Sequence, residues 1–313
     1  MERRTADLGG PVYYLEFPGP SKGPTFVLVH GLGGSHANWL ALAPMLAQRG
    51  RVLALDLPGF GLSPLAGRKA TMSGSRSIIS RFIHDVAATP VVLIGNSMGG
   101  ALSIAQAVED PDWVRGLVLI APALPRHGRH SLDSTVAGFL SAAIVPTIGG
   151  RLIGGRLIVN GLRYYGAKRM VERMLALCTV DPSRVPQEIV DAHLEVAKRR
   201  AFEIDVPAAF LQQTRSLVGT LGRRRRYLGA LRDVSAPTLL IGGASDRLVP
   251  RASVEAIARI RPDWDHVMLD DCGHVPMLEH PRVVANAIDA WLAGPGSWIL
   301  LGTRSLAGQA RAV

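Results

Sequence analysis

Short apolar runs alternate with longer amphipathic stretches along most of the chain. The apolar runs are rich in Val, Ile and Leu, as in strands buried on both faces, and they predict strands at Val12–Phe17, Thr25–His30, Arg51–Leu55, Pro90–Ile94, Gly116–Ile120, Pro237–Ile241 and His266–Leu269. The amphipathic stretches predict helices at Trp39–Arg49, Ser77–Ala88, Gly100–Glu109, Ala252–Arg261 and Pro281–Leu292. Strands that alternate with helices form βα units, so the pattern predicts an α/β fold with a mostly parallel central sheet flanked by helices.

The alternation stops after Ile120 and resumes at Pro237. The residues between them read as helices and turns, and they are far more numerous than an ordinary connection in a compact domain. We therefore expect an inserted, mainly helical cap at 124–230, which divides the core domain into the two parts 1–123 and 231–293.

The two ends of the chain carry weaker patterns. Residues 294–313 are rich in Gly and predict a C-terminal extension, in which Trp298–Leu301 could dock on the core. The first ten residues do not contain the apolar region of a signal peptide, and no stretch reaches about 18 uncharged apolar residues. The sequence therefore favours a cytoplasmic protein.

Positive charge is concentrated in the predicted cap. Of the net charge of +10, most comes from Leu124–Ala230, which has 17 Lys and Arg against 8 Asp and Glu. The run Arg223–Arg226 suggests peripheral contact with an anionic membrane, although charge runs more often form a solvated face. The uncharged Val136–Gly150 either lines an acyl pocket, touches a membrane surface or packs within the cap. No nucleic-acid motif accompanies the charge, so nucleic acid is not an expected partner.

A serine stands in a sharp turn between a predicted strand and a predicted helix. Gly95-Asn96-Ser97-Met98-Gly99 has the pattern GxSxG, and it follows the apolar run at Pro90–Ile94. Such a turn strains the serine backbone and exposes its Oγ near the N-terminus of the next helix. The alternative is an ordinary glycine-rich turn. The context favours Ser97 as a nucleophile.

The loop after Thr25–His30 is also rich in glycine. Its sequence, His30-Gly31-Leu32-Gly33-Gly34, suits an oxyanion hole, with the amide of Leu32 as one donor. The second donor would be the amide of Met98, directly after the serine. The alternative is a turn that merely closes the strand.

Two later strands end next to an acid and a histidine. Asp246 follows Pro237–Ile241, and His274 follows His266–Leu269. The carboxyl ends of parallel strands meet at one edge of a sheet, so both side chains are expected near Ser97. Asp270 and Asp271 are alternative acids, but their adjacency to the histidine in sequence makes it harder for them to reach its Nδ1. Cys272 is a weaker alternative nucleophile.

The order Ser97, Asp246, His274 resembles the α/β-hydrolase family. The resemblance covers Val12–Ala121 and Val234–Leu292 and includes the segment Asp56–Ser63, which is mainly structural in the family. It implies a nucleophilic serine, a histidine base and an orienting aspartate, without a metal or organic cofactor.

Epoxide hydrolases and haloalkane dehalogenases of this family carry an aspartate nucleophile at the position of Ser97. The serine therefore disfavours these two classes of enzyme. Esterases, lipases and thioesterases remain, together with carbon–carbon bond hydrolases of the meta-cleavage type and cofactor-free haloperoxidase-like enzymes. Those carbon–carbon hydrolases tend to carry tryptophan after the histidine, where this chain has Val275-Pro276-Met277, and their loop is HGxGPG-like rather than HGLGGS. The resemblance therefore favours an ester substrate, either a small molecule or a lipid; a weakly catalytic receptor is a further alternative.

Overall fold

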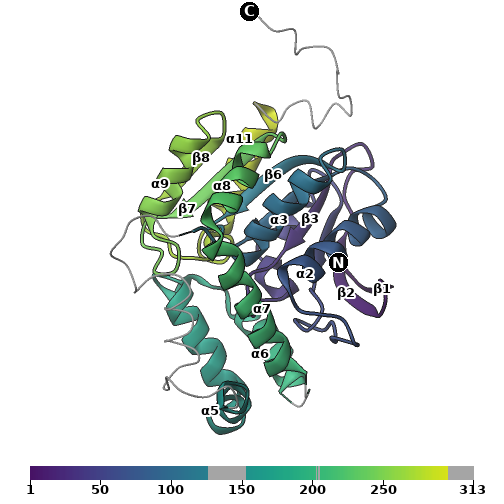
Figure 1. Ribbon diagram of the computed structural model, residues 1–313, viewed down its shortest axis with the longest axis vertical. Coiled ribbons are helices and arrows are strands. Elements are labelled where there is room, and N and C mark those ends of the chain that lie inside the picture. Colours follow the sequence, from purple (N-terminus) through teal and green to yellow (C-terminus); the bar gives the residue numbers. More distant parts are fainter. Residues whose placement is uncertain (126–152, 202, 204, 295–313) are drawn as a thin grey trace, which may run out of the picture.

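The computed structural model describes residues 1–125, 153–201, 203 and 205–294, with the backbone alone at 153–165 (Figure 1). The segments Val136–Gly150 and Trp298–Leu301, for which the sequence suggested contacts, lie outside these residues.

An eight-stranded sheet forms the centre of the described structure. Its order is β1-β2-β4-β3-β5-β6-β7-β8. The strands are β1 (Glu2–Asp7), β2 (Pro11–Phe17), β3 (Thr25–Val29), β4 (Val52–Leu55), β5 (Val91–Asn96), β6 (Val114–Ile120), β7 (Thr238–Gly243) and β8 (Asp265–Leu269). The pairs β1–β2 and β2–β4 are antiparallel and all other pairs are parallel. The predicted α/β fold with a mostly parallel sheet is confirmed.

Helices cover both faces of this sheet (Figure 1). One apolar cluster joins the sheet to α2 (Met72–Arg81), α3 (Met98–Glu109), α8 (Arg224–Asp233) and α9 (Arg251–Ile260). A second cluster lies on the other face and includes α1 (Ala43–Leu46), α10 (Pro276–Glu279) and α11 (Pro281–Ala293). Strands β3, β4, β5 and β7 are buried throughout, and β6 is buried except at Arg115, as their continuous apolar runs predicted.

The described part of the insertion between β6 and β7 is helical. It contains α5 (Ile153–Cys178), which is interrupted at Gly166, the 3-10 turn η3 (Pro182–Arg184), α6 (Gln187–Arg200), α7 (Val206–Gly222) and α8. Figure 1 shows α5, α6 and α7 beyond one end of the sheet, where they form the mainly helical cap. The limits 124 and 230 remain predictions, and α8 runs across residue 230.

Local structure differs from the expected elements in three places. The helix predicted at Trp39–Arg49 is wrong: only the 3-10 turn η1 (His36–Trp39) and the short α1 form, since Pro44 cannot lie inside a longer helix. The helix predicted at Ser77–Ala88 starts earlier, because Thr71 caps α2 by accepting from the Gly74 amide, and its last turn is the π-helix η2 (Phe82–Ala87). Strand β1 was not predicted, because its residues are polar and mostly exposed.

Backbone segments of β3, β5 and α3 approach so closely that one glycine leaves no room for a methyl group. A Cβ built at Gly99 would lie 2.1 Å from the carbonyl oxygen of Val29 and 2.7 Å from that of His30. Both obstacles are backbone atoms of a buried strand end, so they cannot rotate away. By contrast, a Cβ at Gly219 in α7 would meet nothing within 4 Å.

We expect Gly99→Ala and Gly219→Ala to change stability in opposite directions. Gly99→Ala should lower the free energy of unfolding by about 3 kcal/mol, because overpacking strains the core. Gly219→Ala should raise it by about 0.5–1 kcal/mol, because alanine favours an exposed helix interior. Urea unfolding of the two variants measures both effects, and equal stabilities would contradict the close packing at Gly99.

Both cysteines are buried. Cys178 ends α5 and is 6% exposed, and Cys272 is fully buried before His274. Burial raises the pKa of the Cys178 thiol to about 12, with the nearby carboxylates of Asp246 and Glu279 acting in the same direction. Burial also raises the pKa of Cys272. Both side chains are therefore thiols at neutral pH, and Cys272 lacks the thiolate that a cysteine nucleophile requires.

The cysteines should not react with a disulfide reagent at pH 8 while the protein is folded. For Cys178 the thiolate fraction is about 1 in 10,000 at that pH, because the folded pKa lies far above it. A thiol assay in buffer and in denaturant measures this, and both thiols should react after unfolding. Rapid reaction of the folded protein would contradict the burial.

Folding raises the pKa of Cys178 from 9.0 to about 12. The stability that the buried neutral thiol contributes should therefore be lost as pH rises from about 9 to 12.

Candidate active site

Ser97 occupies a strained turn between β5 and α3. Its backbone has φ of 53° and ψ of −118°, which is unfavourable for a residue with a side chain. The Ser97 amide donates to the Ile120 carbonyl at 3.1 Å, and its carbonyl accepts from Ala123 at 2.8 Å. These bonds to the end of β6 hold the turn in place. The predicted strand–turn–helix context of the serine is therefore present.

The glycine-rich loop after β3 passes beside this serine. A Cβ built on Gly31 would lie 3.1 Å from the Cβ of Ser97. The Gly34 amide donates to the Gly31 carbonyl at 3.1 Å, and Gly33 has φ of +74°, so Leu32 lies within a tight turn. Met98 is the first residue of α3, where amides have no carbonyl acceptor inside the helix. Both predicted oxyanion donors thus belong to backbone next to Ser97.

His274 and Asp246 form a buried pair. The Nδ1 of His274 lies 2.8 Å from Oδ2 of Asp246, and both side chains are almost fully buried. The other oxygen of Asp246 accepts from the amides of Leu248 and Val249 at 2.7 and 2.9 Å. These amides fix the carboxylate, and the carboxylate in turn fixes the imidazole.

The alternative acids lie elsewhere. Asp270 and Asp271 are 93% and 66% exposed, and they pair with Arg251 and Arg184 respectively. Of the carboxylates of Asp246, Asp270 and Asp271, the structure places that of Asp246 at the histidine ring.

Asn96 joins the histidine to the serine turn, and the sequence reasoning assigned it no role. Its buried side-chain amide donates to the carbonyls of His274 and Ile120, at 3.2 and 3.0 Å. Asn96 directly precedes Ser97, so this amide places the histidine loop against the serine turn. The only signal in the sequence was its position inside the GxSxG motif.

A second buried aspartate–histidine pair lies between two loops of the core. The Nδ1 of His36 is 2.8 Å from Asp56, which also accepts from the amides of His36 and Leu62. A Cβ on Gly61 would overlap the Asp56 carboxylate, so the loop folds tightly around it. This arrangement agrees with the structural role that the resemblance implied for Asp56–Ser63.

The cap reaches the glycine-rich loops through α6 and α7. A Cβ built on Gly33 would lie 3.1 Å from the ring of Phe210, and one on Gly59 would lie 2.5 Å from the Cβ of Ala209. The guanidinium of the buried Arg200 donates to the carbonyl of Gly59, and burial lowers its pKa. The cap therefore packs directly over the loop that contains Leu32.

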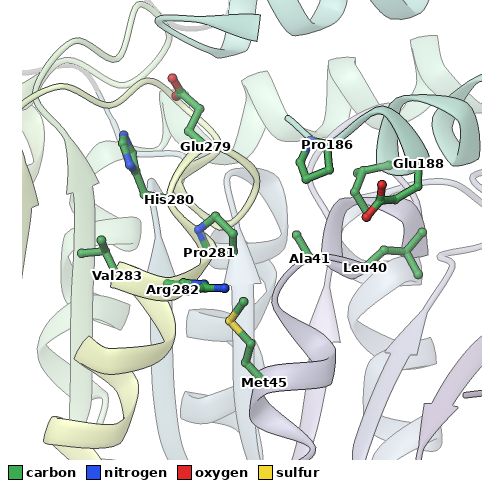
Figure 2. Close-up of a pocket in the computed structure, with 11 residues that line it drawn as sticks. Leu40, Ala41, Met45, Pro186, Glu188, Glu279, His280, Pro281, Arg282 and Val283 are labelled. Carbon is green, nitrogen blue, oxygen red and sulfur yellow. The ribbon is translucent and has the colours of Figure 1, made fainter. Parts of the chain in front are cut away.

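A separate surface cavity of about 550 Å³ lies beside the core (Figure 2). It is lined by Leu40, Ala41, Met45, Pro186, Glu188, Ile189, Glu279, His280, Pro281, Arg282 and Val283. No predicted site residue lines it, so this cavity is not the candidate active site.

The basic run Arg223–Arg226 lies exposed at the start of α8. Its contact with an anionic membrane stays a prediction. Within the described residues, no helix has the length and apolar character needed to cross a bilayer.

Comparisons with known proteins agree on the family. The model of the alpha/beta hydrolase family matches residues 26–287. The chain is 27% identical over 268 residues to a pimeloyl-[acyl-carrier protein] methyl ester esterase of Aeromonas hydrophila, covering 86% of this chain and 95% of the relative. It is 29% identical to a 2-hydroxy-6-oxononadienedioate/2-hydroxy-6-oxononatrienedioate hydrolase of Cupriavidus pinatubonensis, covering 82% and 83%.

Solved structures show the same fold. A crystal structure of a putative lipase from Acinetobacter baumannii matches with a TM-score of 0.74 and 20% identity, over 95% of this chain and 92% of the other. The family model spans both parts of the core and the insertion between them. On this match, together with the sheet order and the strained turn at Ser97, the chain belongs to the alpha/beta hydrolase family.

Proposed function

We propose that this protein is a serine hydrolase that cleaves carboxylic esters with apolar acyl groups through an acyl-enzyme intermediate. The observation that carries the proposal is the buried His274–Asp246 pair. The backbone carbonyl of His274 accepts a hydrogen bond from Asn96, which directly precedes the strained Ser97. This arrangement has a nucleophile, a base and a group that orients the base.

The proposed reaction has two halves. In the first, Ser97 Oγ attacks the ester carbonyl while His274 Nε2 takes its proton, and Asp246 accepts a hydrogen bond from Nδ1 and stabilises the imidazolium. The amides of Leu32 and Met98 stabilise the oxyanion, and the imidazolium protonates the departing alcohol. In the second half, His274 activates water, which attacks the acyl-enzyme and releases the carboxylic acid and Ser97.

The cap supports an apolar acyl group. Phe210 from α7 packs against Gly33, one residue from the proposed oxyanion donor Leu32. A half-buried aromatic ring at this place offers an apolar surface to the part of the substrate beyond the carbonyl. The related methyl ester esterase and the structurally similar lipase are consistent with this substrate class.

Carbon–carbon bond hydrolysis is the second candidate, because the relative from Cupriavidus is named a hydrolase of 2-hydroxy-6-oxo dienedioates and trienedioates. The residues after His274 favour the ester. Val275 and Met277 are buried and apolar, and the three residues directly after the histidine include no tryptophan. A receptor that acylates once without turnover is a third reading.

The first experiment compares the protein with Ser97→Ala on p-nitrophenyl esters from acetate to palmitate and on a monoacylglycerol series. We expect turnover that is lost by at least about 10³-fold in Ser97→Ala, because the nucleophile is removed. A 2-hydroxy-6-oxo-dienoate serves as the comparison substrate. Turnover of that compound alone would establish the second candidate, and a single stoichiometric acylation without turnover would establish the receptor reading.

We expect Asp246→Asn to abolish most turnover while the fold persists. If the asparagine oxygen keeps facing the amides of Leu248 and Val249, its NH₂ group faces Nδ1 of His274. The imidazole proton then moves to Nε2, which can no longer accept the proton of Ser97. Steady-state assays should show a fall in kcat of about 10³–10⁴-fold.

Asp270→Asn is the matched control, because this acid is adjacent in sequence to the histidine loop but exposed. Its kcat should stay near that of the unmodified protein. Normal turnover in Asp246→Asn, or a loss confined to Asp270→Asn, would refute the assignment of the acid.

A further inference from the structure

The loop that carries His274 is held from the cap side as well as from the core. The amide of His274 donates to the carbonyl of Cys178 at 2.6 Å, where α5 ends. A Cβ on Gly273 would lie 2.4 Å from that same carbonyl and 3.0 Å from Cα of Thr179. Arg184 in η3 donates to both the backbone carbonyl and the carboxylate of Asp271. The first residues after α5 are therefore packed directly on the histidine loop.

A buried carboxylate lies at the centre of this contact. Glu279 is 5% exposed and ends α10, the short helix that follows the histidine. Its Oε2 accepts from the amide of Gly273 at 2.7 Å, and its Oε1 accepts from the amides of Val180 and Asp181 at 2.8 and 3.4 Å. One oxygen thus binds the histidine loop and the other binds the cap.

This position requires a carboxylate. All three backbone partners are N–H donors, so both side-chain oxygens must act as acceptors. A neutral amide of the same shape would turn its own N–H toward one of these donors. A buried carboxylate that accepts several N–H groups recovers part of the hydration that it loses.

The proposed reaction gives Glu279 no role. Asp246 already orients the imidazole through Nδ1, and the carboxylate of Glu279 is bonded to backbone amides rather than to the ring. In Figure 2 its carboxylate points away from Arg282 and Met45, although its side chain lines the surface cavity. The contacts assign it to the loop and not to a ligand in that cavity.

We propose that Glu279 is a positioning residue for His274, and that it makes the position of the histidine depend on the cap. Asp246 sets the orientation of the ring, whereas Glu279 and the Cys178 carbonyl set the position of the backbone that carries it. When the segment at the end of α5 moves, the amide of His274 loses the carbonyl of Cys178, and Oε1 of Glu279 loses the amides of Val180 and Asp181. The inference rests on the proposed function, because it gives His274 the role of the base.

The test compares Glu279→Gln with Glu188→Gln. Glu188 lines the same surface cavity but is exposed, so the control makes the same change of charge outside the loop contact. A fluorophosphonate that labels Ser97 counts the active sites in each preparation, and kcat and KM are measured on a short p-nitrophenyl ester. We expect kcat per labelled serine to fall about 10- to 100-fold in Glu279→Gln with KM within about twofold, because the base is displaced by a fraction of an ångström or more. Glu188→Gln should match the unmodified protein.

A second variant separates positioning from folding. Glu279→Asp keeps the charge but is one methylene shorter, so it cannot reach the amides of both Gly273 and Val180. We expect it to lower kcat per labelled serine as well. If both variants only reduce the number of sites that label, with normal kcat at each, Glu279 is merely structural and the inference is overturned.

The outcome also distinguishes the two proposals. An unmodified protein that labels at Ser97 but hydrolyses no ester would refute the proposed function, and the rate of labelling would then replace kcat as the measure of the base. Equal labelling rates in Glu279→Gln and Glu188→Gln would refute the inference in that case. Absence of labelling at Ser97 would refute both.

Discussion

The close approach of β3, β5 and α3 determines the geometry of the whole site. A side chain at Gly95 or Gly99 would collide with backbone atoms, the first with α3 and the second with the end of β3. Because neither glycine has a side chain, α3 can begin immediately after Ser97, and the loop after β3 can pass beside it. The strain at Ser97 is offset by hydrogen bonds to the end of β6. The parallel register of β3, β5 and β6 thus fixes where the serine points.

Three buried carboxylates, those of Asp246, Asp56 and Glu279, each accept hydrogen bonds from several N–H groups. Asp246 accepts from a ring nitrogen and two amides, Asp56 from the ring and amide of His36 and from one further amide, and Glu279 from three amides. A buried carboxylate without such donors would be strongly destabilising. In each unit the amides belong to loops distant in sequence from each other or from the ring, so that the charge also defines how two loops fit together. The two aspartate–histidine pairs differ in their place. Asp246 and His274 lie next to the turn of Ser97, whereas Asp56 and His36 hold two loops of the core together.

The cap contributes to the site in two physically different ways. Through α7 it places an aromatic ring against the glycine-rich loop. Through the last residue of α5 and the residues that follow it, the cap supplies a carbonyl and two amides that hold the histidine loop, directly or through Glu279. The first contact is apolar. The second consists of hydrogen bonds in a buried place, so small displacements of the cap change it sharply.

The sequence by itself determined the buried strands and the family and predicted a set of site residues, because these depend on local patterns. Continuous apolar runs predicted the buried strands, and the glycines around Ser97 predicted the turn. Strand β1 was not predicted, since an exposed edge strand needs no apolar pattern. The helix expected at Trp39–Arg49 did not form as one element, because Pro44 interrupts it. The sequence already favoured Asp246 over Asp270 and Asp271, whereas the contacts of Asn96 and Glu279 came only from the tertiary structure. These contacts join a side chain to backbone groups far away along the chain, and such a hydrogen bond leaves no periodic trace in the sequence.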